Sequence, residues 1–191
     1  MPTPRVFAVL VGFALLFLAV DGFASEGPGV FTLPAGGAVG RWPLEPGMNA
    51  PSFVLKDIDG SAFDLKMERV RSTVLLVFFS MFCEPCRRAL TDAQRLHDRF
   101  GSAGLRVAAV SLDGEPLRNT VSGFVRQEGY GFRVLIDETG AQNQFRAADL
   151  FRVTEIPTAF LINSNGRILL IKKGAIPEEE VEKLLPAAVK Q

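Results

Sequence analysis

The sequence predicts an α/β fold in which helices cover both faces of a mixed sheet. Apolar runs typical of buried strands alternate along the chain with segments whose apolar residues recur at helical spacing. The run Thr73–Phe79 is apolar almost throughout, as expected for a strand with both faces covered. The last two strands, Thr158–Ile162 and Arg167–Lys172, flank an Asn-Gly turn signal and should form a hairpin. Alternation together with this antiparallel pair predicts a mixed sheet.

The domain begins with a predicted β-hairpin. Two short runs, Phe53–Leu55 and Ala62–Leu65, flank the Asp-Gly turn signal at Asp57–Gly60. The central strand follows, and after it a helical pattern covers Arg87–Phe100. Helical spacing gives this helix an apolar face made of Leu90, Ala93, Leu96 or His97, and Phe100.

Strands and helices continue to alternate toward the end of the chain. Pro116 suits the first turn of a helix. The expected elements are a strand at Leu105–Leu112, a helix at Glu115–Glu128, a strand at Phe132–Ile136, a helical stretch at Ala141–Phe151 and, after the hairpin, a closing helix at Glu178–Leu185.

Composition indicates a globular protein without a nucleic-acid partner. The chain has 191 residues, of which 48% are hydrophobic and 22% charged. Its 21 basic and 21 acidic side chains give a net charge of zero, and no basic stripe stands out. The length accommodates one ordinary domain with additional segments.

The N-terminal residues 1–24 have the pattern of a signal peptide or a membrane anchor. Arg5 precedes an uncharged run, Val6–Val20, and Gly22 and Ala24 fit the small positions of a cleavage site after Ala24. Fifteen helical residues span about 22 Å, short of the roughly 30 Å hydrocarbon core, so cleavage is favoured over a retained anchor. Either alternative places the rest of the chain in an oxidising compartment outside the cytoplasm.

Residues 25–46 are rich in glycine and proline, which predicts a flexible tether. The single tryptophan, Trp42, lies in this segment. The folded domain is therefore expected to cover residues 47–191.

The only two cysteines, Cys83 and Cys86, lie between the central strand and the helix that follows. This position puts Cys83 at a helix N-terminus, where unpaired N–H groups and the positive dipole end favour thiolate over thiol. Cys86 lies one turn inside, close enough to attack a mixed disulfide on Cys83. Pro85 suits the first helical turn, and the charge of Glu84 opposes a second negative charge on its neighbour. The pair is expected to exchange disulfides.

Two other interpretations of the cysteine pair are weaker. A structural disulfide stabilises most when it closes a long loop, whereas only two residues separate these cysteines. A zinc site needs about four ligands. The only histidine, His97, lies eleven residues past Cys86, roughly 16 Å along a helix, so it cannot share an ion with the cysteines. We expect neither a metal nor another cofactor.

The motif and its flanking segments resemble the thioredoxin superfamily, and within it the TlpA/ResA-type extracytoplasmic thiol–disulfide oxidoreductases, whose domain is redoxin- or AhpC/TSA-like. The resemblance extends from Gly47 to Leu185. Matching segments include Gly47–Phe53, the opening hairpin, the Glu-Pro pair between the cysteines, the insert at Glu115–Ile136 and the segment Ile156–Ile162.

The resemblance implies that Pro157 is cis and, with Ile156, faces the cysteines. It also implies protein disulfides or dithiols as substrates, with apocytochrome c or copper-centre assembly proteins of a respiratory oxidase among them. A membrane thiol carrier would supply electrons, and the membrane would be reached only through an N-terminal anchor. Whether the pair works as reductant or oxidant depends on its reduction potential.

This chain departs from the family pattern at positions around the motif. Phe79 and Phe82 occupy positions where members carry tryptophans. Their rings are expected to form an apolar collar that shields Cys86, but they lack the indole N–H of tryptophan. Members' usual proton-handling acids are replaced by Ala89 and Val77. Glu155 is a candidate substitute, with a surface carboxylate as the simpler interpretation.

Two alternative functions remain at the level of sequence. Peroxiredoxins share the fold and use a Pro-x-x-x-Thr/Ser-x-x-Cys pattern; Ser80 fits the hydroxyl position, but Leu76 replaces the proline. Copper chaperones related to this family use Cys-x-x-x-Cys with a distal histidine, which the two-residue spacing and the position of His97 disfavour.

Overall fold

A computed structural model of the chain describes residues 43–139 and 145–185. The predicted signal peptide or anchor, most of the predicted tether and Trp42 lie outside the described residues. The first part of the helix expected at Ala141–Phe151 also lies outside them.

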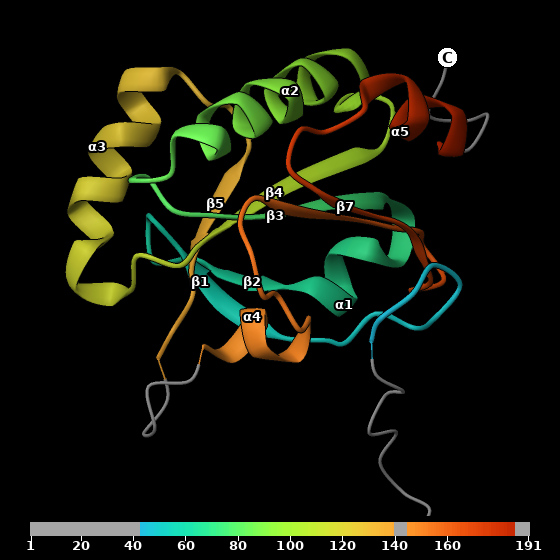
Figure 1. Ribbon diagram of the computed structural model, residues 1–191, viewed down its shortest axis with the longest axis horizontal. Helices are drawn as coiled ribbons and strands as arrows, with labels where there is room; N and C mark the ends of the chain where they lie inside the picture. Colours follow the sequence, from blue (N-terminus) through green and yellow to red (C-terminus); the bar gives the residue numbers. More distant parts are fainter. Residues whose placement is uncertain (1–42, 140–144, 186–191) are drawn as a thin grey trace, which may run out of the picture. The chain divides into compact units, whose positions relative to one another are not determined.

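The described residues contain one mixed sheet of seven strands in the order β2-β1-β5-β4-β3-β6-β7 (Figure 1). Strands β3, β4 and β5 are mutually parallel, and the other neighbouring pairs are antiparallel. This confirms the predicted fold class. The strand bounds are β1 Val54–Asp57, β2 Ala62–Asp64, β3 Thr73–Phe79, β4 Leu105–Ser111, β5 Arg133–Ile136, β6 Thr158–Ile162 and β7 Ile168–Lys173.

Helices cover both faces of the sheet, as Figure 1 shows. Residues of α2, α3 and α5 share one apolar cluster with alternate residues of β3, while residues of α1 and α4 belong to the cluster on the other face. The helical bounds are α1 Leu65–Glu68, η1 Arg69–Arg71, α2 Glu84–Phe100, η2 Glu115–Leu117, α3 Arg118–Glu128, α4 Arg146–Leu150 and α5 Glu178–Leu184.

The central strand β3 lies between β4 and β6, and all seven of its residues are buried. Leu75, Val77 and Phe79 face the cluster under α2, and the intervening side chains face the opposite cluster. Each Å² of buried apolar surface stabilises the fold by about 25 cal/mol. Because both faces of this strand are buried, it is a main contributor to the stability of the core.

Some boundaries differ from those expected from the sequence. Helix α2 begins at Glu84 rather than Arg87, because proline is tolerated in a first helical turn. Leu90, Ala93, Leu96 and Phe100 form its buried stripe, while His97 is only partly buried.

Two short helical segments and one tighter turn were not expected. The segments α1 and η1 follow β2, and Asp64 caps α1 by accepting hydrogen bonds from the N–H groups of Lys66 and Met67. The expected helix at Glu115–Glu128 begins with the 3₁₀ turn η2 before it continues as α3.

A buried carboxylate joins β5 to α4. Asp137 is fully buried, and its two oxygens accept hydrogen bonds from the backbone N–H groups of Ala147 and Ala148, at 2.9 and 2.8 Å. Burial raises the pKa of Asp137 because it disfavours the charged form, and the backbone hydrogen bonds oppose that effect. The carboxylate therefore fixes the start of α4 at a cost in desolvation.

Substituting Asp137 by alanine should destabilise the domain. Two buried N–H groups lose their acceptor, so the free energy of unfolding should fall by about 2–4 kcal/mol. Because the raised pKa lets the folded state bind a proton more tightly than the unfolded state, the stability contributed by protonated Asp137 is present at low pH and lost as pH rises through that pKa. The deficit of the variant should therefore be largest in acid.

Urea denaturation of both proteins at several pH values measures this effect. Asp98→Ala on α2 is the control, because Asp98 is exposed and is not among the groups that shift the pKa of Asp137, and such surface changes stay within about 0.5 kcal/mol. Equal stability of Asp137→Ala and wild type would show that the buried carboxylate does not hold α4.

Candidate active site

The two cysteines lie where β3 gives way to α2. Cys83 is the N-cap residue of α2, with extended backbone angles, and Cys86 lies in its first turn. The two form a disulfide, with Cα atoms 5.2 Å apart. Cys83 is partly exposed and Cys86 is fully buried within the cluster under α2. The structure therefore brings the predicted pair together and gives its members unequal access to solvent.

The helix terminus supplies the electrostatic field at the pair. Helix α2 has 17 residues, and no side-chain hydrogen bond caps its first turn. Its unpaired N–H groups and its dipole favour negative charge at this end. Pro85 occupies the first turn, where it needs no hydrogen-bond acceptor. Glu84 is exposed, and its carboxylate lies 3.9 Å from the guanidinium of Arg87.

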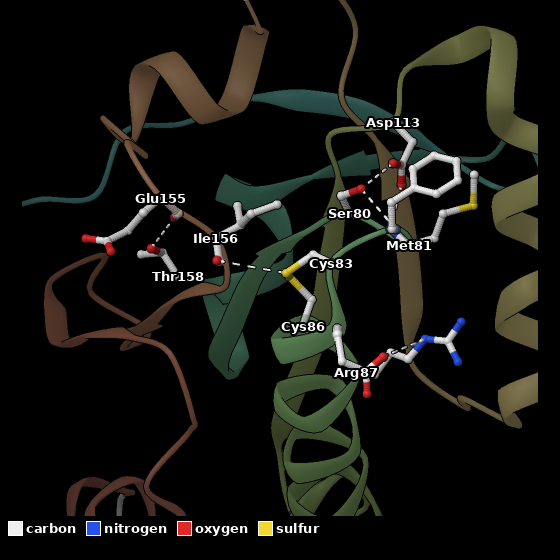
Figure 2. Close-up of a disulfide and its surroundings, with 11 residues drawn as sticks. Ser80, Met81, Cys83, Cys86, Arg87, Asp113, Glu155, Ile156 and Thr158 are labelled. Carbon is white, nitrogen blue, oxygen red and sulfur yellow. Dashed lines mark hydrogen bonds and ion pairs between the residues drawn. A yellow bond between two sulfur atoms is a disulfide. The ribbon is translucent and has the colours of Figure 1, made fainter.

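The segment before β6 faces the disulfide. The Ile156–Pro157 peptide bond is cis, as expected from the resemblance. The carbonyl oxygen of Ile156 lies 3.9 Å from the Sγ atom of Cys83, and Figure 2 shows it directed at that sulfur. Pro157 is buried, and its carbonyl oxygen accepts a hydrogen bond from the N–H of Gly174. A strand distant in sequence thus contributes backbone to the site.

The expected collar of two phenylalanine rings around the motif is not formed. Phe79 is fully buried, and its ring lies 6.5 Å from that of Phe124. Phe82 is 76% exposed, so it does not shield Cys86 as expected. Phe79 is buried because both faces of β3 are covered, whereas Phe82 lies in the turn beyond the strand.

The family positions for proton-handling acids hold apolar residues here. Ala89 and Val77 are both fully buried. Glu155, the candidate substitute, is exposed and forms an ion pair with Lys173. Figure 2 shows its side chain directed away from the sulfurs, so the structure does not support a proton-accepting role for Glu155.

A carboxylate that the sequence analysis did not single out lies beside the motif. Asp113, which follows β4, accepts hydrogen bonds from the Ser80 hydroxyl at 2.6 Å and from the Met81 N–H at 3.0 Å. Since β3 and β4 are parallel, residues just after their ends meet at one edge of the sheet. The acidic residue two positions beyond a buried strand was the available sequence signal.

The described residues give no indication of metal binding or of a membrane span. Among residues 43–139 and 145–185, no group of three or more His, Cys, Asp or Glu side chains is placed to hold an ion. His97 packs against the ring of Phe132, at 6.2 Å between centroids. No helix in this part of the chain is both long and apolar enough to cross a bilayer.

Comparison with known proteins agrees with this geometry. The model of the AhpC/TSA family matches residues 46–171. The chain belongs to the AhpC/TSA family. A thiol-disulfide oxidoreductase ResA of Halalkalibacterium halodurans is 30% identical over 139 residues, covering 73% of this chain and 74% of that protein. The ResA protein of Geobacillus thermodenitrificans is 32% identical over 139 residues, covering 73% of this chain and 75% of that protein.

Solved structures of other bacterial proteins show the same fold. A Chlorobium tepidum protein assigned as the thiol:disulfide interchange protein DsbE is 30% identical, with a TM-score of 0.62 over 72% of this chain and 92% of that one. StoA from Bacillus subtilis is 24% identical, with a TM-score of 0.56 over 72% of this chain and 98% of that one, and it supports the fold. Together with the ResA relatives, these likenesses confirm the predicted enzyme class, thiol–disulfide oxidoreductase.

Substituting Glu84 by glutamine should make Cys83 react with alkylating agents at lower pH. The carboxylate adjoins the thiolate in sequence and opposes its charge, while the helix terminus favours it. Because Glu84 is exposed, the midpoint of the rate profile should move by only about 0.2–0.7 pH unit.

Iodoacetamide modification of the reduced protein across pH measures this midpoint. Glu179→Gln, an exposed acidic residue in the first turn of α5, is the control and should leave the profile unchanged. A shift toward higher pH in Glu84→Gln would show that the carboxylate supports the thiolate rather than opposing it.

Proposed function

We propose that this protein is an extracytoplasmic thiol–disulfide oxidoreductase in which Cys83 attacks and Cys86 resolves. The observation that carries the assignment is the unequal exposure of the two sulfurs at the start of α2. A partner disulfide can approach the partly exposed Cys83, while Cys86 is fully buried behind it. The helix terminus favours the thiolate form of the cysteine that caps it.

The proposed exchange has two balanced steps. In the first, the Cys83 thiolate attacks one sulfur of a partner disulfide, forms a mixed disulfide and releases the other partner sulfur as a thiolate, which takes up a proton. In the second, deprotonated Cys86 attacks the Cys83 sulfur. This step restores the intramolecular disulfide seen in the structure and releases the partner as a dithiol. Two electrons pass from the cysteine pair to the partner, and the reverse sequence oxidises a partner dithiol.

Residues around the sulfurs are proposed to support this exchange. The backbone of Ile156, whose carbonyl oxygen lies 3.9 Å from the Cys83 sulfur, offers main-chain groups to an incoming extended segment. Glu84 and Pro85 shape the start of α2, and exposed Phe82 presents an apolar ring on the residue that precedes the attacking cysteine. A partner that approaches Cys83 would therefore meet the backbone of Ile156 and the exposed ring of Phe82, the residue before the cysteine.

Location and partners are proposed from the sequence and from the names of the relatives. The N-terminal pattern in residues 1–24 supports export with cleavage or a retained anchor. Protein substrates with paired cysteines suit a thiol–disulfide oxidoreductase. Apocytochrome c and copper-centre assembly proteins are the proposed members of that class. A membrane thiol carrier is the proposed electron donor, which returns the pair to its dithiol form after each reduction.

Replacing Cys86 by serine should trap the mixed disulfide. Without a resolving thiol, Cys83 stays joined to its partner, and a covalent complex should accumulate in the extracytoplasmic fraction. Cys83→Ser should trap little, since Cys86 is buried and meets no partner directly. Electrophoresis without reductant, followed by identification of the joined protein, measures both outcomes, and the partner should contain a pair of cysteines.

Two results would contradict the proposed roles. A complex formed by Cys83→Ser and not by Cys86→Ser would reverse the attacking and resolving cysteines. Absence of a complex from either variant, together with consumption of peroxide by the wild type, would instead favour a peroxidase.

A further inference from the structure

The turn that carries Cys83 is hydrogen-bonded to one carboxylate that lies just after the neighbouring strand β4. In the register of β3 with β4, Phe79 lies opposite Ser111, so residues two positions further on, Met81 and Asp113, lie side by side. The Met81 N–H donates to Oδ2 of Asp113 at 3.0 Å, and the Ser80 hydroxyl donates to Oδ1 at 2.6 Å. The Ser111 hydroxyl adds a third bond, to Oδ2, at 2.7 Å.

These contacts continue into the active-site turn. The hydroxyl oxygen of Ser80 accepts a hydrogen bond from the Phe82 N–H at 3.2 Å, and its carbonyl oxygen accepts one from the Cys83 N–H at 3.1 Å. Ser80 thus joins Asp113 to the residue that carries the reactive sulfur. Figure 2 shows the carboxylate directed toward this turn.

The carboxylate meets only neutral donors. An ionised carboxylate is acceptor-only, and two hydroxyls and one backbone N–H match that form. The ion pairs identified among the described residues join other carboxylates. Its negative charge is therefore placed against the hydrogen-bond donors of the turn. Asp113 and Ser80 are both partly buried, which limits screening by salt.

We propose that Asp113 is a positioning residue that holds the Ser80–Cys83 turn and keeps the cysteine pair reducing through its charge. This inference rests on the proposed roles of Cys83 and Cys86. A negative charge beside the turn disfavours a thiolate, which exists only in the reduced form of the pair. Disfavouring the reduced form shifts the equilibrium toward the disulfide, so the pair gives electrons to partners more readily. Positions 89 and 77 hold the apolar residues Ala89 and Val77, and Asp113 supplies a carboxylate from the turn after β4.

The test measures the equilibrium of the purified protein with reduced and oxidised glutathione. Asp113→Asn removes the charge at nearly constant size. It should shift the equilibrium toward the dithiol by about threefold to tenfold, where tenfold corresponds to about 30 mV for a two-electron couple. Cys83 of this variant should also be alkylated at lower pH. Asp113→Glu keeps the charge and should stay within about twofold of wild type, even if the domain melts at a lower temperature.

A matched control and a second variant complete the test. Asp98→Asn makes the same change on α2, fifteen residues from Cys83 or roughly 22 Å along the helix, and should leave the equilibrium unchanged. If Asp113→Asn does not fold, Ser80→Ala replaces it. Loss of one neutral donor leaves the charge less compensated and should shift the equilibrium toward the disulfide.

Three outcomes would overturn the inference. They are an Asp113→Asn equilibrium within twofold of wild type, an Asp113→Glu shift as large as that of Asp113→Asn, or a Ser80→Ala equilibrium that is unchanged or moves toward the dithiol. Failure of the wild type itself to exchange with glutathione would instead count against the proposed function. The two kinds of failure are therefore distinguishable.

Discussion

Burial of β3 on both faces is the constraint on which the active site depends. The strand pairs in parallel with β4 and antiparallel with β6, and its side chains alternate between two apolar clusters. A slip of one residue would exchange the contents of these clusters, so the register is strongly specified. The end of β3 is therefore fixed in space, and with it the turn that leads to Cys83. Because β4 and β6 pair with β3, the residues next to the ends of these two strands surround that turn.

Each neighbour of β3 contributes a different chemical component to the site. The Ile156–Pro157 segment directly precedes β6, and the carbonyl oxygen of Ile156 lies 3.9 Å from the Cys83 sulfur. Asp113, two residues after the end of β4, accepts hydrogen bonds from Ser80 and Met81, just before the motif. The helix α2 supplies the field of its N-terminus. The helix terminus, which favours a thiolate, and the Asp113 carboxylate, which disfavours it, thus both act on the turn that leads to Cys83.

The apolar residues at the family's usual acidic positions fit this arrangement. Val77 is in β3 and Ala89 in α2, and both pack in the cluster that also contains Cys86. A carboxylate buried there would need compensating hydrogen bonds or would cost several kcal/mol. Asp113 lies instead at the edge of the sheet, where hydroxyl and backbone donors satisfy it. The charge is kept near the motif without being placed in the core.

The sequence by itself determined the fold class, the limits of β3, the cysteine pair at the start of a helix and the terminal hairpin, because these depend on local periodicity and spacing. The short segments α1 and η1 escaped prediction, since four and three residues carry too little periodicity. Only the tertiary structure decided that Phe82 is exposed, that Glu155 pairs with Lys173 and that Asp113 holds the active-site turn. These relations join residues far apart in the chain, and strand order and register, which set them, are not local properties of the sequence.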